Sequence, residues 1–119
     1  MDPIYGPNGH VAAWLERPDC VRSLDGAVIG WLHGDAVHGL GGQHVGYFND
    51  GLFRDQRGDV VAWVTGARGG PVKPVKQAAP IRPIRQVRPV RAIRQIRQVR
   101  AVKSLHWSSQ SIEAYLPSR

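Results

Sequence analysis

Four short stretches decide the fold of this 119-residue chain: GHVAAWL at 9–15, GAVIGWL at 26–32, GQHVGYF at 42–48 and GDVVAWV at 58–64. Their leading glycines are separated by 17, 16 and 16 residues. The fifth column holds only alanine or glycine, and the sixth holds only tryptophan or tyrosine. Such regularity at a fixed period identifies an internal repeat. A repeat domain is expected over 1–67, with units at about 4–19, 20–35, 36–51 and 52–67.

Each unit has the residues of a β-hairpin. The aligned glycine completes a two-residue turn, as in Asn8-Gly9 and Asp25-Gly26, and type I′ turns favour such pairs because both positions need positive φ. A second set of turns, including Asn49-Asp50-Gly51, joins the units. Turns about every eight residues indicate an up-and-down meander. We therefore expect an all-β barrel of four hairpins with pseudo-four-fold symmetry, closed or nearly closed, because closure removes exposed edges.

Both faces of the expected strands are apolar. Strict alternation in the first unit places Val11, Ala13 and Leu15 on one face. Ala12 and Trp14 then take the other face. A closed sheet needs only one apolar face for its core, so the second face must be covered by the tail, another subunit, a ligand or a membrane.

The basic tail, residues 72–103, repeats every three residues. A β-branched apolar residue precedes a basic one in ten of eleven successive triplets, and only Ala78-Ala79-Pro80 departs. A polyproline II helix has three residues per turn and would give separate Val/Ile, Lys/Arg and Pro/Gln/Ala stripes. This conformation is expected up to about Pro89, whereas strand, helix and disorder stay open beyond it. The tail is then either solvated or docked by its Val/Ile stripe on the second apolar face.

Charge is distributed unevenly along the chain. Residues 1–67 hold four basic and eight acidic residues, a formal charge of −4, whereas 72–103 hold ten basic and no acidic residues. This asymmetry predicts an anionic partner for the tail: nucleic acid, lipid headgroups or the acidic repeat domain itself. The candidate anion-binding residues are Arg82, Arg85, Arg88, Arg91, Arg94, Arg97 and Arg100.

Two shorter segments flank the tail. Residues 68–71 form a Gly/Pro junction, and 104–119 form an expected docking segment. Ile112, Tyr115 and Leu116 share one face at helical spacing just before a proline. We expect a short helix or turn here, which pins the tail by Trp107 and Tyr115.

These features together resemble the four-fold β-flower domain family of bacteria. The resemblance rests on the repeat columns, the Gly69-Gly70-Pro71 junction, the triplet tail and the SLHWS stretch at 104–108, and it covers nearly the whole chain. It implies a shallow, symmetric barrel whose petals surround an apolar channel. It implies no assigned activity and no catalytic residues, and binding of lipid or another hydrophobic ligand is its only functional suggestion. His44 and Tyr47 depart from the repeat in the third unit.

The aromatic column is the best candidate for a ligand site, although aromatic stripes usually serve packing, either in the core or beneath the tail. It consists of Trp14, Trp31, Tyr47 and Trp63. The chain contains no nucleophile-elbow, P-loop or dinucleotide motif, and its five histidines lack metal-ligand spacing. Cys20 is the only cysteine, so it has no disulfide partner within the chain. We expect no enzyme, no cofactor and no metal site.

The expected function is a non-enzymatic binding module for a hydrophobic ligand or membrane component, with the cationic tail as clasp or anchor. One alternative is a structural or homo-oligomeric interaction protein without a small-molecule ligand. Another is non-specific nucleic-acid binding through the tail. The sequence starts without a signal-peptide pattern and has no apolar run of membrane-spanning length, so a cytoplasmic location, or one peripheral to a membrane, is expected.

Overall fold

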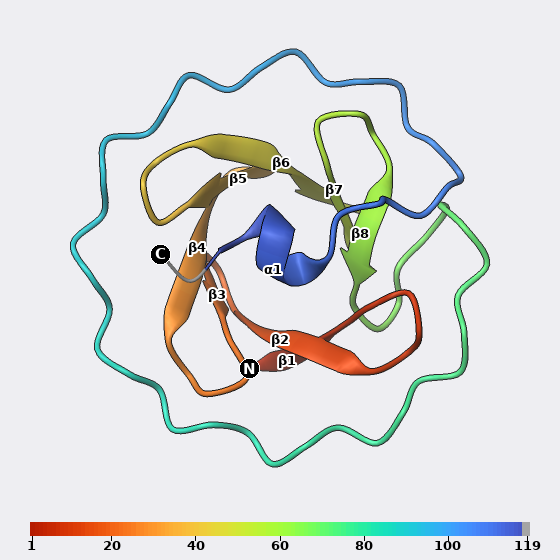
Figure 1. Cartoon of the computed structure of the whole chain (residues 1–119), viewed down its shortest axis with the longest axis horizontal. Coiled ribbons are helices and arrows are strands. Elements are labelled where there is room, and N and C mark those ends of the chain that lie inside the picture. Colours follow the sequence, from red (N-terminus) through yellow and green to blue (C-terminus); the bar gives the residue numbers. More distant parts are fainter. Residues whose placement is uncertain (118–119) are drawn as a thin grey trace.

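The barrel is built from eight strands that each pair antiparallel with the next (Figure 1). The computed structural model describes residues 1–117. The strands are β1 (Asp2–Tyr5), β2 (Val11–Glu16), β3 (Cys20–Arg22), β4 (Val28–His33), β5 (Ala36–Gly39), β6 (His44–Asn49), β7 (Leu52–Arg54) and β8 (Val60–Trp63). β1 also pairs with β8 through Tyr5 and Trp63, so the sheet closes. The predicted all-β barrel of four hairpins is confirmed.

The four hairpins form petals 1 to 4, which are β1–β2, β3–β4, β5–β6 and β7–β8. Their tips are not the two-residue type I′ turns that the sequence predicts. In petal 1 the amide of Gly9 donates to the carbonyl of Gly6, and Gly9 has a φ of 84° while Asn8 does not have positive φ. This pattern is a type I turn followed by a left-handed glycine, which is the usual three-residue hairpin loop. Consecutive positive φ angles occur instead at Asp50 and Gly51, in the turn between petals 3 and 4.

Strand alternation is broken once in every petal, so the predicted faces are partly wrong. In petal 1, Ile4 pairs with Ala13 but Tyr5 pairs with Val11, which leaves Ala12 as an extra residue. The same register shift skips Ile29, Val45 and Val61 in the other petals. A β-bulge sets two residues opposite one, and the strand direction changes there. As a result Ala12 packs with the barrel interior, and Val11 lies outside with Trp14.

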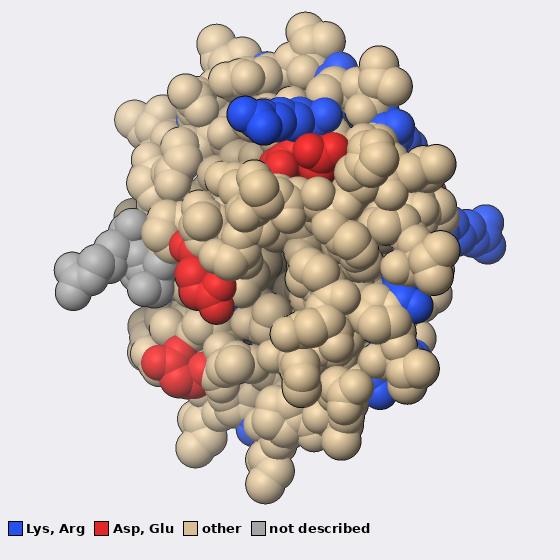
Figure 2. Space-filling model, turned by 45° about the vertical axis from the view of Figure 1, so that its right-hand side comes forward, with Lys and Arg blue, Asp and Glu red and all other residues tan. Residues whose placement is uncertain are grey.

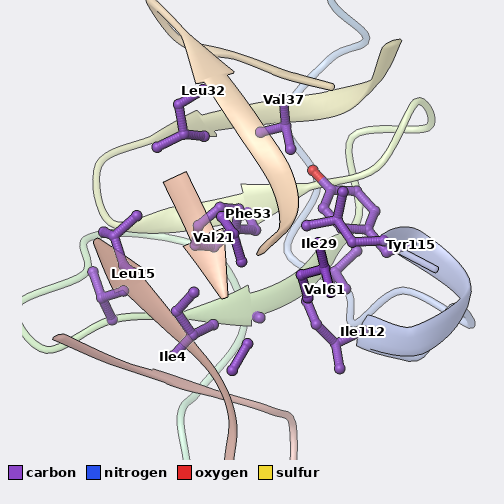
Figure 3. Close-up of a cluster of buried hydrophobic side chains, with 14 residues drawn as sticks. Ile4, Leu15, Val21, Ile29, Leu32, Val37, Phe53, Val61, Ile112 and Tyr115 are labelled. Carbon is purple, nitrogen blue, oxygen red and sulfur yellow. The ribbon is translucent and has the colours of Figure 1, made fainter. Parts of the chain in front are cut away.

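The main core fills the barrel interior (Figure 3). Its fully buried members include Ile4, Leu15, Val21 and Phe53. Smaller apolar clusters lie outside the barrel wall, one around Trp14 and Trp63 and another around Trp31. Both faces of the sheet are therefore buried, which agrees with the apolar character of both faces in the sequence.

The basic tail forms a belt (residues 72–103) that encircles the petals and contains no helix or strand (Figure 1). The molecule measures 36 × 36 × 22 Å, so it is a flat disc. A chain of 32 residues in a three-residue helix spans about 100 Å, and a disc 36 Å across has a perimeter of about 113 Å. The length of the belt thus matches nearly one full turn around the disc.

The chain returns to the barrel after the belt. Trp107 makes an isolated parallel bridge with Val60, and helix α1 (Ile112–Tyr115) follows. Ser111 caps this helix by accepting a hydrogen bond from the amide of Ala114. The helix lies at the centre of the barrel mouth (Figure 1), with Ile112 and Tyr115 buried against the core (Figure 3). The expected short helix is present, and only residues 118–119 of the expected segment lie outside the described part of the chain.

Candidate functional site

Main-chain hydrogen bonds join the belt to the tip of every petal at intervals of nine residues. In each, a belt amide donates to the carbonyl of the tip glycine: Gln77 to Gly9 (2.9 Å), Gln86 to Gly26 (3.2 Å), Gln95 to Gly42 (2.7 Å) and Ser104 to Gly58 (3.2 Å). Nine residues are three turns of a three-residue helix. The same side of the belt therefore faces each tip.

The tip glycines are required by the belt as well as by the turn. Gly26 has a φ of +94°, and a Cβ atom there would collide with the carbonyl oxygen of Ile84. Gly34, in the turn between β4 and β5, has a φ of +59°, but nothing lies within 4 Å of its Cβ position. Backbone conformation alone explains Gly34, whereas Gly26 also provides space for the belt.

A clamp residue in three petals binds a belt carbonyl. Arg22 donates from Nη1 to the carbonyls of Gly26 and Gln86, both at 2.7 Å. Arg54 makes the same pair of bonds in petal 4, and in petal 3 the ring of His38 contacts the Gln95 carbonyl at 3.0 Å. These clamp residues lie four positions before each tip glycine, and petal 1 has a tyrosine there. These residues were not predicted, because the repeat columns were compared only on the C-terminal side of each tip glycine.

The belt arginines face carboxylates in the turns between petals. Arg85 and Arg88 pair with Glu16 at 2.8 and 3.1 Å, and Arg88 also pairs with Asp19. The hydrogen bond from Arg85, followed by that from Arg22, lowers the pKa of Glu16 to about 2. The remaining contacts are Arg91–Asp19, Arg94–His33, Arg97–Asp35, Arg100–Asp35 and Lys103–Asp50.

Within residues 1–117, two of the seven candidate anion-binding arginines lack a carboxylate partner: Arg94, which contacts the ring of His33, and Arg82. Arg82 makes no ion pair with any residue in 1–117. Its counterparts nine and eighteen residues later pair with aspartates between petals. The aspartate at the matching repeat position is Asp2, which pairs instead with Arg17 at 2.9 Å. Six of the ten belt cations thus pair with four carboxylates of the acidic repeat domain.

The aromatic column lies beneath the belt on the outer wall of the barrel, and it does not form one ring-lined pocket. All four side chains are 5 % exposed or less. Trp14 and Trp63 share a cluster, whereas Trp31 lies in another. The guanidinium of Arg91 lies 4.3 Å from the centre of the Trp31 ring, and that of Arg97 lies 5.3 Å from the Tyr47 ring. These distances are those of cation–π contacts, so the aromatic side chains help to hold the belt.

The Val/Ile stripe of the belt points outward, which contradicts the prediction that it docks on the second apolar face. Its ten side chains are 83–96 % exposed. The reason is that other parts of the belt face the barrel wall. The Lys/Arg stripe forms ion pairs with carboxylates and contacts aromatic rings, and the belt backbone forms hydrogen bonds with the petal tips. The remaining stripe is left in solvent. These residues form the rim: Val72, Val75, Ile81, Ile84, Val87, Val90, Ile93, Ile96, Val99 and Val102.

Helix α1 uses the small-residue column of the barrel. A Cβ at Gly30 would lie 2.7 Å from Cδ2 of Leu116, and one at Gly46 would lie 2.6 Å from the hydroxyl of Tyr115. That hydroxyl donates to the carbonyl of Arg54 at 2.8 Å. A Cβ at Gly46 would also collide with the carbonyl oxygen of Arg54, so glycine is required there by the neighbouring strand as well as by Tyr115. The column has alanine in petals 1 and 4. Open grooves of about 480 and 490 Å³ flank the helix.

Petal 3 contains a buried histidine pair beneath the belt. The rings of His38 and His44 are 5.3 Å apart and both are 5 % exposed or less. Nδ1 of His44 accepts a hydrogen bond from the amide of Gln98 at 3.1 Å, which requires an unprotonated nitrogen. Burial lowers the pKa of both rings. His38 therefore takes the place that a clamp arginine occupies in petals 2 and 4, and the ring of His44 lies beside it.

Within residues 1–117, no three His, Cys, Asp or Glu side chains lie together as metal ligands would. No helix in this range is long and apolar enough to span a bilayer. Cys20 is buried, and its burial raises the pKa of the thiol to about 11, which makes the thiol a poor nucleophile.

Comparison with known proteins gives one match. The model of a family described as "4-fold beta flower protein" matches residues 2–116, which is nearly the whole chain. No curated protein and no solved structure matches the chain.

Proposed function

The chain belongs to the 4-fold beta flower family, and we propose that it acts as a non-enzymatic binding module which holds a hydrophobic partner or membrane component on the rim. The supporting observation is the exposure of all ten rim side chains at 83–96 %. Isolated exposed apolar residues are ordinary on protein surfaces, whereas large continuous apolar patches mark interaction sites. A row that follows the perimeter from Val72 to Val102, interrupted only at 78–80, belongs to the second class.

The belt serves as the clasp in this proposal. Its arginines contact Glu16, Asp19 and Asp35, and these pairs fix the orientation in which the rim faces outward. Charge and exposed apolar surface are thereby separated: the charge mainly orients the belt and the apolar stripe meets the partner. The proposal includes a cytoplasmic location, with the protein at the periphery of a membrane when the partner is a membrane component.

The experiment measures the binding of a hydrophobic fluorescent dye to the full chain. A triple variant, Val87→Ser, Val90→Ser and Ile93→Ser, removes three neighbouring rim side chains. The control, Ala78→Ser with Ala79→Ser, changes exposed belt residues outside the rim. Dye fluorescence is expected to fall in the triple variant and to stay unchanged in the control, with the same far-UV circular dichroism in all three proteins. Equal dye fluorescence in the triple variant and the wild type would remove the support for the rim as a binding surface.

A further inference from the structure

The rim has a row of cationic side chains directly beside it. Although five belt arginines pair with carboxylates, the side chains of these five stay 40–62 % exposed, with Arg85 at 62 % and Arg97 at 45 %. The period of three places each arginine next to a rim residue in the chain. Figure 2 shows Lys and Arg side chains at intervals around the margin of the molecule. The edge of the disc therefore presents an apolar row and a cationic row side by side.

One arc of the belt carries both rows without interruption. Residues 81–100 contain seven rim residues and seven arginines and no acidic residue. The opposite arc, 72–80, has two lysines, and its triplet Ala78-Ala79-Pro80 lacks both the rim residue and the cation. A partner that uses both rows is best matched by residues 81–100.

We propose that the belt arc 81–100 binds the surface of a lipid bilayer that contains anionic headgroups. The rim side chains at the middle of the arc, Val87, Val90 and Ile93, enter the interface between headgroups and acyl chains, and the adjacent guanidiniums meet headgroup phosphates and carboxylates. This inference rests on the proposed function, since it names the partner that the rim takes. The disc stands with its edge against the bilayer, because the arc lies on the perimeter.

Two other occupants fit the arc less well. A second copy of the chain would bring two cationic rows together, and like charges oppose that contact. A nucleic acid would bind the guanidiniums through its phosphates, but its phosphate backbone has no apolar surface that would contact the rim. A bilayer with anionic lipid is complementary to both rows, and its fluid surface adapts to a convex edge.

The test is co-flotation of the full chain with phosphatidylcholine vesicles that contain or lack phosphatidylserine. Binding to the vesicles with phosphatidylserine is expected to be at least about tenfold tighter, because each basic residue near an anionic surface favours binding, and it is expected to weaken as salt is added. The triple variant Val87→Ser, Val90→Ser and Ile93→Ser is expected to lose most of this binding. The control, Ala78→Ser with Ala79→Ser, is expected to keep it.

Several results would overturn the inference. The first is no flotation with the vesicles that contain phosphatidylserine; the second is undiminished flotation of the triple variant. Retention of wild type and triple variant alike on duplex DNA, without flotation, would assign the arc to nucleic acid. Light scattering that shows a dimer only for the wild type, again without flotation, would assign it to a second copy.

The dye experiment separates this inference from the proposed function. If vesicles fail to bind but the triple variant still lowers dye fluorescence, the rim remains a hydrophobic binding surface and only the lipid partner is rejected. If the triple variant changes neither readout, both are rejected.

Discussion

The barrel and the belt are held in place by different forces. The barrel has a closed hydrogen-bond ladder and side chains that are fully buried, such as Phe53 and Val21. The belt buries none of its rim side chains and is held by tip carbonyls, partly exposed ion pairs and cation–π contacts. Apolar burial contributes about 25 cal/mol per Å², whereas an exposed ion pair contributes about 1 kcal/mol at most. The belt is therefore expected to detach under milder conditions than those that unfold the barrel.

The largest effect is expected from a cavity in the barrel core. Phe53 is fully buried, and its ring lies 4.3 Å from that of Phe48. Phe53→Ala should lower the free energy of unfolding by about 3–5 kcal/mol. Urea unfolding followed by far-UV circular dichroism measures this change. Ile84→Ala, on the rim, is the control and should change it by less than about 0.5 kcal/mol. Equal losses of unfolding free energy in the two variants would show that the core and the rim contribute equally to stability.

A smaller effect, confined to the belt, is expected from a petal tip. Gly26→Ala places a Cβ against the carbonyl of Ile84, so the contact between petal 2 and the belt should weaken. The free energy of local opening should fall by about 2 kcal/mol, which raises the opening equilibrium about thirtyfold. Trypsin cleavage after Arg85 and Arg91 should accelerate accordingly. Gly34→Ala is the matched control, because it has positive φ but no belt contact. Equally fast cleavage in both variants would attribute the effect to the backbone angle alone.

The third prediction concerns the histidine clamp of petal 3. Burial lowers the pKa of His38 and His44 below the ordinary value of 6.5, so the unfolded chain takes up protons first as the pH falls. The stability from these rings is complete above about pH 6.5 and decreases below it. Arg94 and Arg97 lie close enough to oppose a second positive charge. Tryptic cleavage at petal 3 should therefore accelerate on acidification more than cleavage at petal 2.

A substitution taken from the repeat itself tests this prediction. His38→Arg introduces the residue type that clamps petals 2 and 4. The substitution should remove part of the acceleration of tryptic cleavage at petal 3 between about pH 7.5 and 5.5. At the lower pH, the free energy of local opening should change by about 1 kcal/mol. An unchanged pH profile would show that His38 is not responsible.

The smallest effect is expected from one carboxylate between petals. Asp35→Asn removes the partner of Arg97 and Arg100, whose side chains are 45 % and 42 % exposed, so the loss should be about 0.5–1 kcal/mol. Hydrogen exchange at residues 95–100 measures it. The difference from wild type should vanish near 1 M salt, where charges are screened within about 3 Å. Asp59→Asn is the control, because Asp59 makes no ion pair in the described chain; a salt-independent difference would contradict the electrostatic explanation.

The number of strands, the petals and the short helix could be predicted because each leaves a strong local pattern. The bulges could not, because both faces of each strand are apolar and one skipped residue leaves alternation looking intact. Ala12 and Val11 show this, since both side chains are apolar and neither marks the change of face.

The three stripes of the belt could be predicted, but not which of them faces the barrel. Its period defines three stripes, but all three could face the barrel on chemical grounds. The choice depends on Asp19 and Asp35, which lie more than 60 residues before the belt arginines that they pair with. The clamp residues could have been found, because Arg22, His38 and Arg54 align when the repeat is read backward from its glycine.

The nine-residue spacing of the belt has an evolutionary consequence. Each petal occupies 16 or 17 residues of the chain and one belt interval occupies nine, so the two repeats must change together. A gene that gained a petal by duplication would also need nine more codons in the belt. Without them, no belt residue would reach the tip of the last petal. Loss of a single triplet would keep every stripe in phase but shift all later tip contacts by a third of a petal. Insertions and deletions in the belts of relatives should therefore occur in multiples of nine and accompany changes in petal number.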